Sequence, residues 1–169
     1  MVSAIGLGCM RFGGVFGAAD EAASQRCLDA AFDAGMIFPD TANIYGKGLC
    51  AEVMGRFFNR RRVAVTVATK AAIVDGGARS FDNSEAHLRA EREGSLKRMG
   101  VEGVDLFYIR RRIHRREQER PVEAVVEGLS RLIAEGKIGG YRLLEGSPAT
   151  LRRAHAVHPC CAVQNEYSL

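Results

Sequence analysis

Short apolar runs alternate with longer amphipathic stretches along the whole chain. The runs typical of strands cover residues 4–10, 36–38, 63–69, 104–109, 138–144 and 160–164. Stretches with the period of a helix lie between them, and the clearest of these follows Pro121. Strands that alternate with helices are typical of a parallel sheet, so the pattern predicts an α/β fold with about six strands and five helices. The period alone leaves open whether this is an open doubly wound sheet or a barrel.

Capping residues predict where several helices begin and end. A helix over residues 20–34 should end at Gly35, because a C′ position favours the left-handed conformation of glycine. Asn83 or Ser84 should cap the start of the third helix. Pro121 should occupy the first helical position of the fourth helix, where its missing N–H costs nothing.

Glycine pairs mark two further features. Gly6 and Gly8 lie in the first predicted strand, but the third glycine of a dinucleotide-binding fingerprint does not follow, so we reject a Rossmann fold. Gly76 and Gly77 open a longer loop between the third predicted strand and the third helix.

Length and composition favour one globular domain that spans residues 1–169. The chain is 47% hydrophobic, yet no apolar run approaches the roughly 18 residues of a membrane-spanning helix. The first residues lack a basic-then-apolar signal pattern, so we expect a cytoplasmic protein with no membrane partner. The five cysteines are scattered and odd in number, which favours reduced thiols. The four histidines form no ligand motif, so no metal is predicted.

The net charge of +4 is mild, and much of it comes from the run at residues 110–116. A run of this kind can bind phosphates of nucleic acid. However, no aromatic residues interleave with the arginines, and Glu117 and Glu119 follow at once. A solvated loop is therefore the favoured interpretation, and no nucleic-acid partner is predicted. A salt-sensitive gel shift with nucleic acid would favour the nucleic-acid interpretation instead.

Three candidate chemical groups follow predicted strands. Asp40 comes after the second apolar run, Tyr45 lies five residues later, and Lys70 ends the third run. Each type of residue alone is usually structural, but the carboxyl ends of parallel strands share one edge of the sheet. A carboxylate that holds an ammonium beside a phenol suits proton transfer to a carbonyl, because the ammonium stabilises the phenolate.

Several stretches resemble the aldo/keto reductase family. The strongest are FDAGMIFPDTANIYG at 32–46 and VATK at 67–70. Further matches, in order and at near-family spacing, are IGLGCM at 5–10, SLKRMG at 95–100, VDLFY at 104–108, PATLRRAHAVHP at 148–159 and AVQNEYS at 162–168. The resemblance covers nearly the whole chain and implies a parallel (β/α)8-barrel, with its chemistry at the carboxyl ends of the strands.

The resemblance also implies a reaction. In this family a nicotinamide cofactor, usually NADPH, delivers hydride to an aldehyde or ketone. Tyr45 matches the proton donor, Lys70 the residue beside it, and Asp40 the partner of that lysine. Met10, Asp40 and Gln164 match cofactor-binding positions. We therefore expect a small carbonyl substrate.

The fourth catalytic position of the family, a histidine after the fourth strand, has two candidates. Counting forward from Asp105 gives Arg110, whereas counting backward from residues 121–123 gives His114. The two counts differ by residues 110–113, which look inserted, and four residues advance a strand by about 13 Å. His114 is the candidate with the family's side chain; Arg110 would place a fixed cation there instead.

The chain ends soon after the sixth predicted strand, so we expect an incomplete barrel. The portion that the resemblance places beyond it carries the aromatic residue that stacks on the nicotinamide and the site for the adenosine 2′-phosphate. We therefore expect NADPH binding no tighter than millimolar, with reduction of common test aldehydes below detection. The alternative function is an inactive remnant, or scaffold, that binds a partner chain. Open sheet edges would also favour self-association.

Overall fold

The computed structural model of the chain describes residues 2–62, 65–71, 73–74, 80–110 and 120–167. Six strands form one sheet, in the order β1-β2-β3-β6-β7-β8, and neighbouring strands in it are parallel. Their bounds are β1 Leu7–Gly8, β2 Pro39–Asp40, β3 Ala68–Ala71, β6 Leu106–Arg110, β7 Tyr141–Leu144 and β8 Ala162–Gln164.

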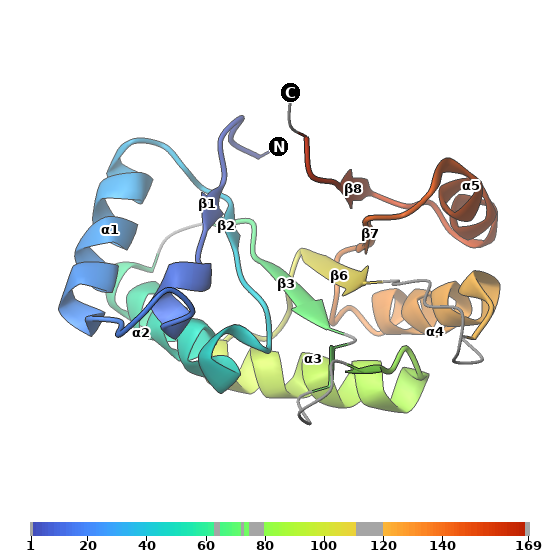
Figure 1. The fold of residues 1–169 in the computed structure, drawn as a ribbon, viewed down its shortest axis with the longest axis horizontal. Helices are drawn as coiled ribbons and strands as arrows, with labels where there is room; N and C mark the ends of the chain where they lie inside the picture. The colour runs from blue at the N-terminus through green and yellow to red at the C-terminus, as the bar shows by residue number, and fades with distance from the viewer. Residues whose placement is uncertain (1, 63–64, 72, 75–79, 111–119, 168–169) are drawn as a thin grey trace.

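Five helices cover the outer face of this sheet. They are α1 Glu21–Asp33, α2 Leu49–Arg61, α3 Glu85–Met99, α4 Val122–Ala134 and α5 Pro148–Val157. In Figure 1 the helices lie to the left of, below and to the right of the sheet, and both ends of the chain lie on the opposite side. The fold is thus a curled half-barrel, and the prediction of an incomplete (β/α)8-barrel with six parallel strands and five helices is confirmed.

Most of the predicted caps are confirmed. Gly35 follows α1 with φ +83°, in the left-handed region. Ser84, rather than Asn83, caps α3, and its hydroxyl accepts a hydrogen bond from the His87 N–H at 3.2 Å. Pro121 is the N-cap of α4 instead of its first helical residue, so that prediction is wrong by one position.

The first two strands are shorter than the apolar runs suggested. The run at 36–38 precedes β2, because the Met36 N–H donates to the Ala31 carbonyl and so belongs to the turn that ends α1. In β1, the Leu7 N–H donates to the Phe38 carbonyl and the Cys9 N–H to the Asp40 carbonyl. Lys70 also lies within β3, where the sequence placed it at the end of a strand.

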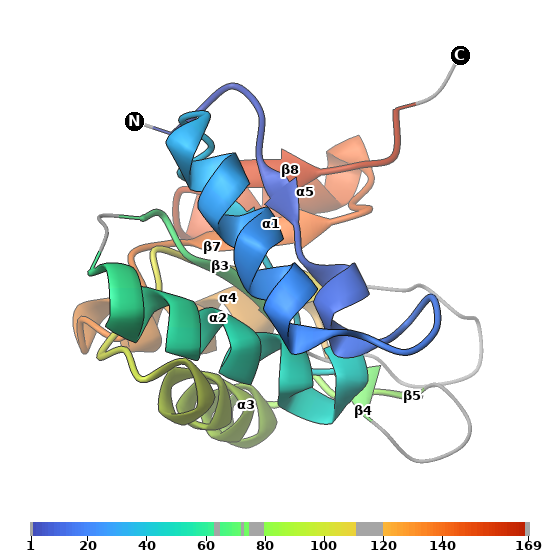
Figure 2. The ribbon, with the colours of Figure 1, turned by 90° about the vertical axis from the view of Figure 1, so that its left-hand side faces the viewer.

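Gly76 and Gly77, where the sequence predicts a longer loop, lie outside the described residues, but a short strand lies on either side of them. Strand β4, Ile73–Val74, pairs in antiparallel fashion with β5, Ser80–Phe81. The β-branched pair of β4 lies soon after Lys70 in the chain. In Figure 2 the labels of β4 and β5 lie at the lower right of the molecule.

Side chains of the sheet alternate between two packing layers. Phe107 and Ile109 pack outward with helix residues such as Phe57 and Leu129 in the main core. Leu106 and Tyr108 point to the other face, where they form a small cluster with Ala68 and Phe38. The period of two along β6 therefore places the Tyr108 side chain on the concave, inner face.

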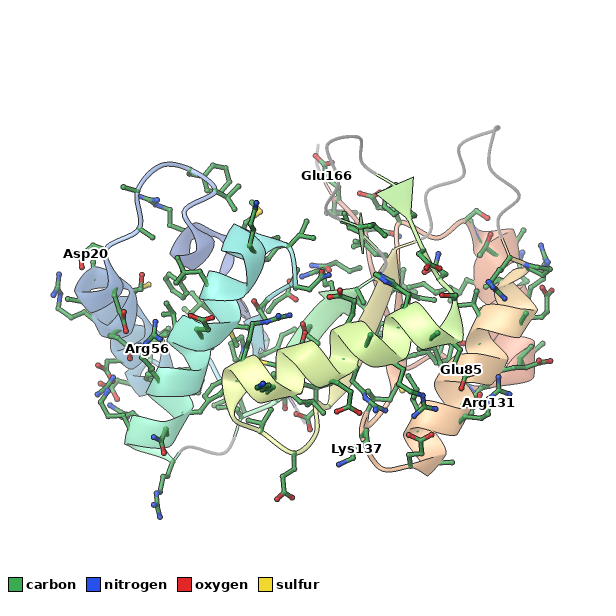
Figure 3. All side chains as sticks on the ribbon, turned by 90° about the horizontal axis from the view of Figure 1, so that it is seen from below. Asp20, Arg56, Glu85, Arg131, Lys137 and Glu166 are labelled. Atoms are coloured by element: carbon green, nitrogen blue, oxygen red, sulfur yellow. The ribbon has the colours of Figure 1, made fainter. Side chains whose placement is uncertain are left out.

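Ion pairs join neighbouring helices on the outside. The Arg131 guanidinium donates to Glu85 Oε2 at 2.6 Å, and Figure 3 shows these two side chains next to one another on α4 and α3. Arg89 donates to both carboxylate oxygens of Glu135, at 2.6 and 2.7 Å. These hydrogen bonds lower the pKa of Glu135 to about 2.

Within the part of the chain that the structure describes, β1 and β8 each pair with a single strand. The predicted open edges are therefore present, while self-association through them gains no support from the structure. None of the described helices is both long and apolar enough to cross a membrane.

Candidate active site

An ion pair between Asp40 and Lys70 forms the centre of the site. Asp40 is in register with Ala68, so Lys70 lies two residues farther along β3 on the same face. The Lys70 ammonium donates to both carboxylate oxygens of Asp40 at 2.5 Å and to the Thr41 carbonyl at 3.2 Å. Lys70 is only 9% exposed. Its charge is therefore held by a carboxylate and a carbonyl away from bulk water.

Tyr45 lies beside this pair. It begins the short 3-10 helix η2, Tyr45–Gly48, which follows β2, and its ring centroid lies 5.5 Å from Lys70 Nζ. A second short helix, η1 at Met10–Gly13, packs closely against it. A Cβ atom on Gly13 would lie 2.5 Å from the Tyr45 carbonyl carbon. Glycine at position 13 thus allows the close backbone contact between η1 and the start of η2, where Tyr45 lies.

Gln164 reaches the site from the opposite edge of the sheet. Its Nε2 atom donates to Asp40 Oδ2 at 3.3 Å, which links β8 to β2 across the concave face. Its Oε1 atom is buried and accepts no hydrogen bond from the described residues. The contact shows how strongly the sheet curls, and it leaves an acceptor available in the wall of the site.

A cavity of about 360 Å³ opens over these residues. Lys70, Tyr45 and Gln164 lie in its wall, and Met10 contributes an apolar thioether. Its remaining lining residues are Ala42, Asn43, Ile44, Ala71, Ile73, Leu144, Glu145, Asn165 and Glu166. The cavity brings together four of the predicted site residues, and Asp40 is hydrogen-bonded to two of them, Lys70 and Gln164.

Two buried thiols lie behind the ion pair. The Thr41 hydroxyl donates to Cys50 Sγ at 3.0 Å, and the Cys50 thiol donates to the Cys9 carbonyl at 3.1 Å. An interaction between the Cys9 and Cys50 side chains and the hydrogen bond from Thr41 lower the pKa of Cys50, helped by the Lys70 charge. The same interaction between the two side chains, together with burial, raises the pKa of Cys9. This network ties η1 and the start of α2 to the end of β2.

Two residues near Lys70 were not foreseen. Lys70 Nζ lies 5.4 Å from the ring centroid of Tyr108, and Arg142 Nη1 donates to the Tyr108 hydroxyl at 2.6 Å. Burial raises the pKa of Tyr108, although the Arg142 hydrogen bond opposes this shift. Their meeting follows from the register between β3, β6 and β7, which the sequence pattern does not reveal.

The fourth catalytic position is only partly described. Arg110 ends β6, where its backbone is in register with Leu144. His114 lies outside the described residues. The choice between them stays a prediction.

Comparison with known sequences gives a consistent match. A sequence model of the Aldo/keto reductase family matches residues 4–169. The NADP(+) aldo-keto reductase yakc of Schizosaccharomyces pombe is 38% identical over 172 residues, a match that covers 99% of this chain and 49% of the relative.

Solved structures show the same similarity. A glycerol dehydrogenase from Gluconobacter oxydans superposes with a TM-score of 0.86 at 27% identity, over 97% of this chain and 51% of that one. An aldo/keto reductase from Klebsiella pneumoniae, in complex with NADP and acetate, gives a TM-score of 0.79 at 26% identity, over 98% and 55%. The chain spans about half the length of the proteins that it matches.

Proposed function

Because the chain belongs to the aldo/keto reductase family, we propose that it reduces an aldehyde or ketone to an alcohol with NADPH and that Tyr45 donates the proton. The observation that carries this proposal is the Lys70 ammonium, held by both oxygens of Asp40 and 5.5 Å from the Tyr45 ring, in the wall of a cavity. NADPH as the hydride source is supported by the similar Klebsiella enzyme, which was solved with NADP.

Each residue of the cluster has a separate task in this proposal. Asp40 holds the ammonium in place, and Lys70 stabilises the negative charge that Tyr45 acquires when its proton leaves. Tyr45 gives that proton to the carbonyl oxygen while the carbonyl carbon becomes a C–H centre. When bound, the dihydronicotinamide supplies the hydride.

The residues present suit the nicotinamide end of the cofactor. The buried Oε1 atom of Gln164 needs a donor, and a carboxamide N–H is one that would satisfy it. Met10 offers an apolar contact on the other side of the cavity. We propose that Gln164, Met10 and Asp40 form this part of the cofactor site.

His114 is our candidate for a second donor to the carbonyl oxygen, and Arg110 is its competitor. Substituting alanine for each in turn separates the two. The residue that fills the position should lower kcat when removed, since a lost transition-state donor typically costs about a hundredfold. The other substitution should have a small effect.

The test compares two tyrosine variants at millimolar NADPH. Tyr45→Phe should lower the rate of reduction of an activated benzaldehyde by at least about a hundredfold, the usual contribution of a positioned acid. Tyr167→Phe is the matched control, since Tyr167 is 96% exposed. Equal rates in both variants would refute the role of Tyr45. No reduction by the unaltered protein would favour the scaffold alternative.

A further inference from the structure

Aromatic rings and cations alternate across the inner face of the half-barrel. Arg142 Cζ lies 5.2 Å from the ring centroids of both Phe38 and Tyr108. Lys70 Nζ lies 5.4 Å from Tyr108 and 5.5 Å from Tyr45. Successive contacts of this kind therefore connect Phe38 to the proposed proton donor. We call this series of five residues, Phe38, Arg142, Tyr108, Lys70 and Tyr45, the inner row.

The register of three neighbouring strands produces the centre of this row. Lys70 of β3 is paired with Tyr108 of β6, and Tyr108 is paired with Arg142 of β7. Paired residues of parallel strands lie side by side on the same face, about 5 Å apart. The three side chains are thus neighbours because of the sheet itself, so they do not depend on a loop for their arrangement.

Arg142 is an unusual component of this row. Among the described residues, no carboxylate forms an ion pair with it, and its Nε atom is buried there without a hydrogen-bond partner. Its described partners are the Tyr108 hydroxyl and two ring faces. A half-buried cation of this kind costs stability unless it is well compensated. Stability alone is therefore a poor reason for its presence.

Lys70 has two phenols beside it, and only one can be the proposed proton donor. The hydrogen bonds of the ammonium go to Asp40 and to the Thr41 carbonyl. Tyr45 and Tyr108 lie at nearly equal distances from it, at 5.5 and 5.4 Å. Arg142 donates to the hydroxyl of Tyr108, and burial raises the pKa of this phenol. The Tyr108 hydroxyl is thus held by a cation on the neighbouring strand.

We propose that Arg142 is a positioning residue, which holds the Tyr108 hydroxyl away from Lys70 so that Tyr45 alone acts as the proton donor. This inference rests on the proposed carbonyl reduction. Without Arg142, the Tyr108 hydroxyl loses the donor that holds it, and in this proposal a change of the χ1 angle then brings it toward the ammonium. Tyr108 then competes with Tyr45 for the same cation, and the proton is less readily transferred to substrate.

A set of three variants tests this competition. Arg142→Met should lower kcat roughly tenfold or more with little change in KM, because ground-state binding is untouched. The double variant Arg142→Met with Tyr108→Phe should regain most of the lost activity, since the competing hydroxyl is gone. Arg142→Gln keeps a donor for that hydroxyl and should lose less. Arg152→Met, an exposed arginine on α5, is the matched control.

Crystal structures provide a readout that needs no activity. In Arg142→Met the Tyr108 hydroxyl should lie within about 3 Å of Lys70 Nζ, a hydrogen-bond distance, and in Arg142→Gln it should not. If the unaltered protein reduces no carbonyl, the proposed function fails and this distance decides the positioning role by itself.

Two results would overturn the inference. One is an Arg142→Met structure in which the Tyr108 hydroxyl stays where it is. The other is a double variant as inactive as Arg142→Met, which would show that Arg142 only packs on the inner face of the sheet. If Arg142→Met does not fold, Arg142→Gln and its double variant with Tyr108→Phe give the same comparison, with a smaller expected loss and rescue.

Discussion

The centre of the sheet and its edges differ sharply in how firmly they hold the site. All four residues of β3 are buried, and Lys70 is 9% exposed there. In the edge strand β8 the exposure alternates, and Val163 is 37% exposed. Lys70 thus belongs to a fully buried strand, and Asp40 holds it from the neighbouring strand β2. Gln164, which we assign to the cofactor, belongs to an edge strand.

This difference suggests a division of tasks. Proton transfer requires fixed geometry, and a strand buried on both faces supplies it at the cost of any freedom to adapt. An edge strand opens more readily, since fewer apolar contacts hold it. Substitutions at the centre should therefore damage folding and chemistry together, whereas substitutions at the edge should leave folding almost unchanged.

The largest effect should come from the main core, which lies between the sheet and the helices. Phe57 is fully buried and its ring centroid lies 4.8 Å from that of Phe32. Phe57→Ala should lower the free energy of unfolding by about 3–5 kcal/mol, because it removes apolar contacts and leaves a cavity. Val163→Ala in the edge strand should cost about 1 kcal/mol or less. Urea denaturation measures both, and similar losses would contradict the comparison.

A smaller loss should follow from breaking the central ion pair. Asp40→Asn leaves the buried Lys70 ammonium without its carboxylate, which should cost about 3 kcal/mol of unfolding free energy. The double variant Asp40→Asn with Lys70→Met should recover much of this loss, because no unpaired charge remains. Both should abolish the proposed reduction. A stable single variant would mean that water already compensates the charge of Lys70.

The smallest effect should be a pH dependence from the outer ion pairs. Hydrogen bonds from Arg89 lower the pKa of Glu135 from 4.5 to about 2 in the folded protein. The unfolded chain binds a proton at higher pH than the folded one, so this contribution is complete above pH 4.5 and is lost as the pH falls toward 2. Glu135→Gln should flatten the acid limb of unfolding free energy against pH. If the slope of unfolding free energy against pH is the same in Glu135→Gln, the ion pair with Arg89 does not contribute in this way.

Sequence patterns predicted the architecture because each rests on local chemistry. Alternating runs predicted the parallel sheet, and Gly35 and Ser84 marked helix ends through backbone needs that only a few residue types meet. The boundary of β2 was wrong because apolar character alone cannot distinguish a strand from the turn that ends α1. There, the Met36 N–H is used by a helix carbonyl.

The site shows the same limit. Asp40, Tyr45 and Lys70 were predicted as neighbours because strand ends of a parallel sheet converge. Tyr108 and Arg142 were missed because their meeting with Lys70 depends on the register between β3, β6 and β7. No local pattern encodes that register, since it follows from how the helices pack the whole sheet.

The most direct test of the central claim is deuteride transfer. The unaltered protein, Tyr45→Phe and Tyr167→Phe are each given an activated benzaldehyde and millimolar NADPH deuterated at the transferred position, and the product alcohol is analysed by mass spectrometry. The account predicts an alcohol that carries a single deuterium, formed by the unaltered protein and by Tyr167→Phe and nearly absent with Tyr45→Phe. Deuterated alcohol formed equally by Tyr45→Phe, or formed by none of the three, would contradict it.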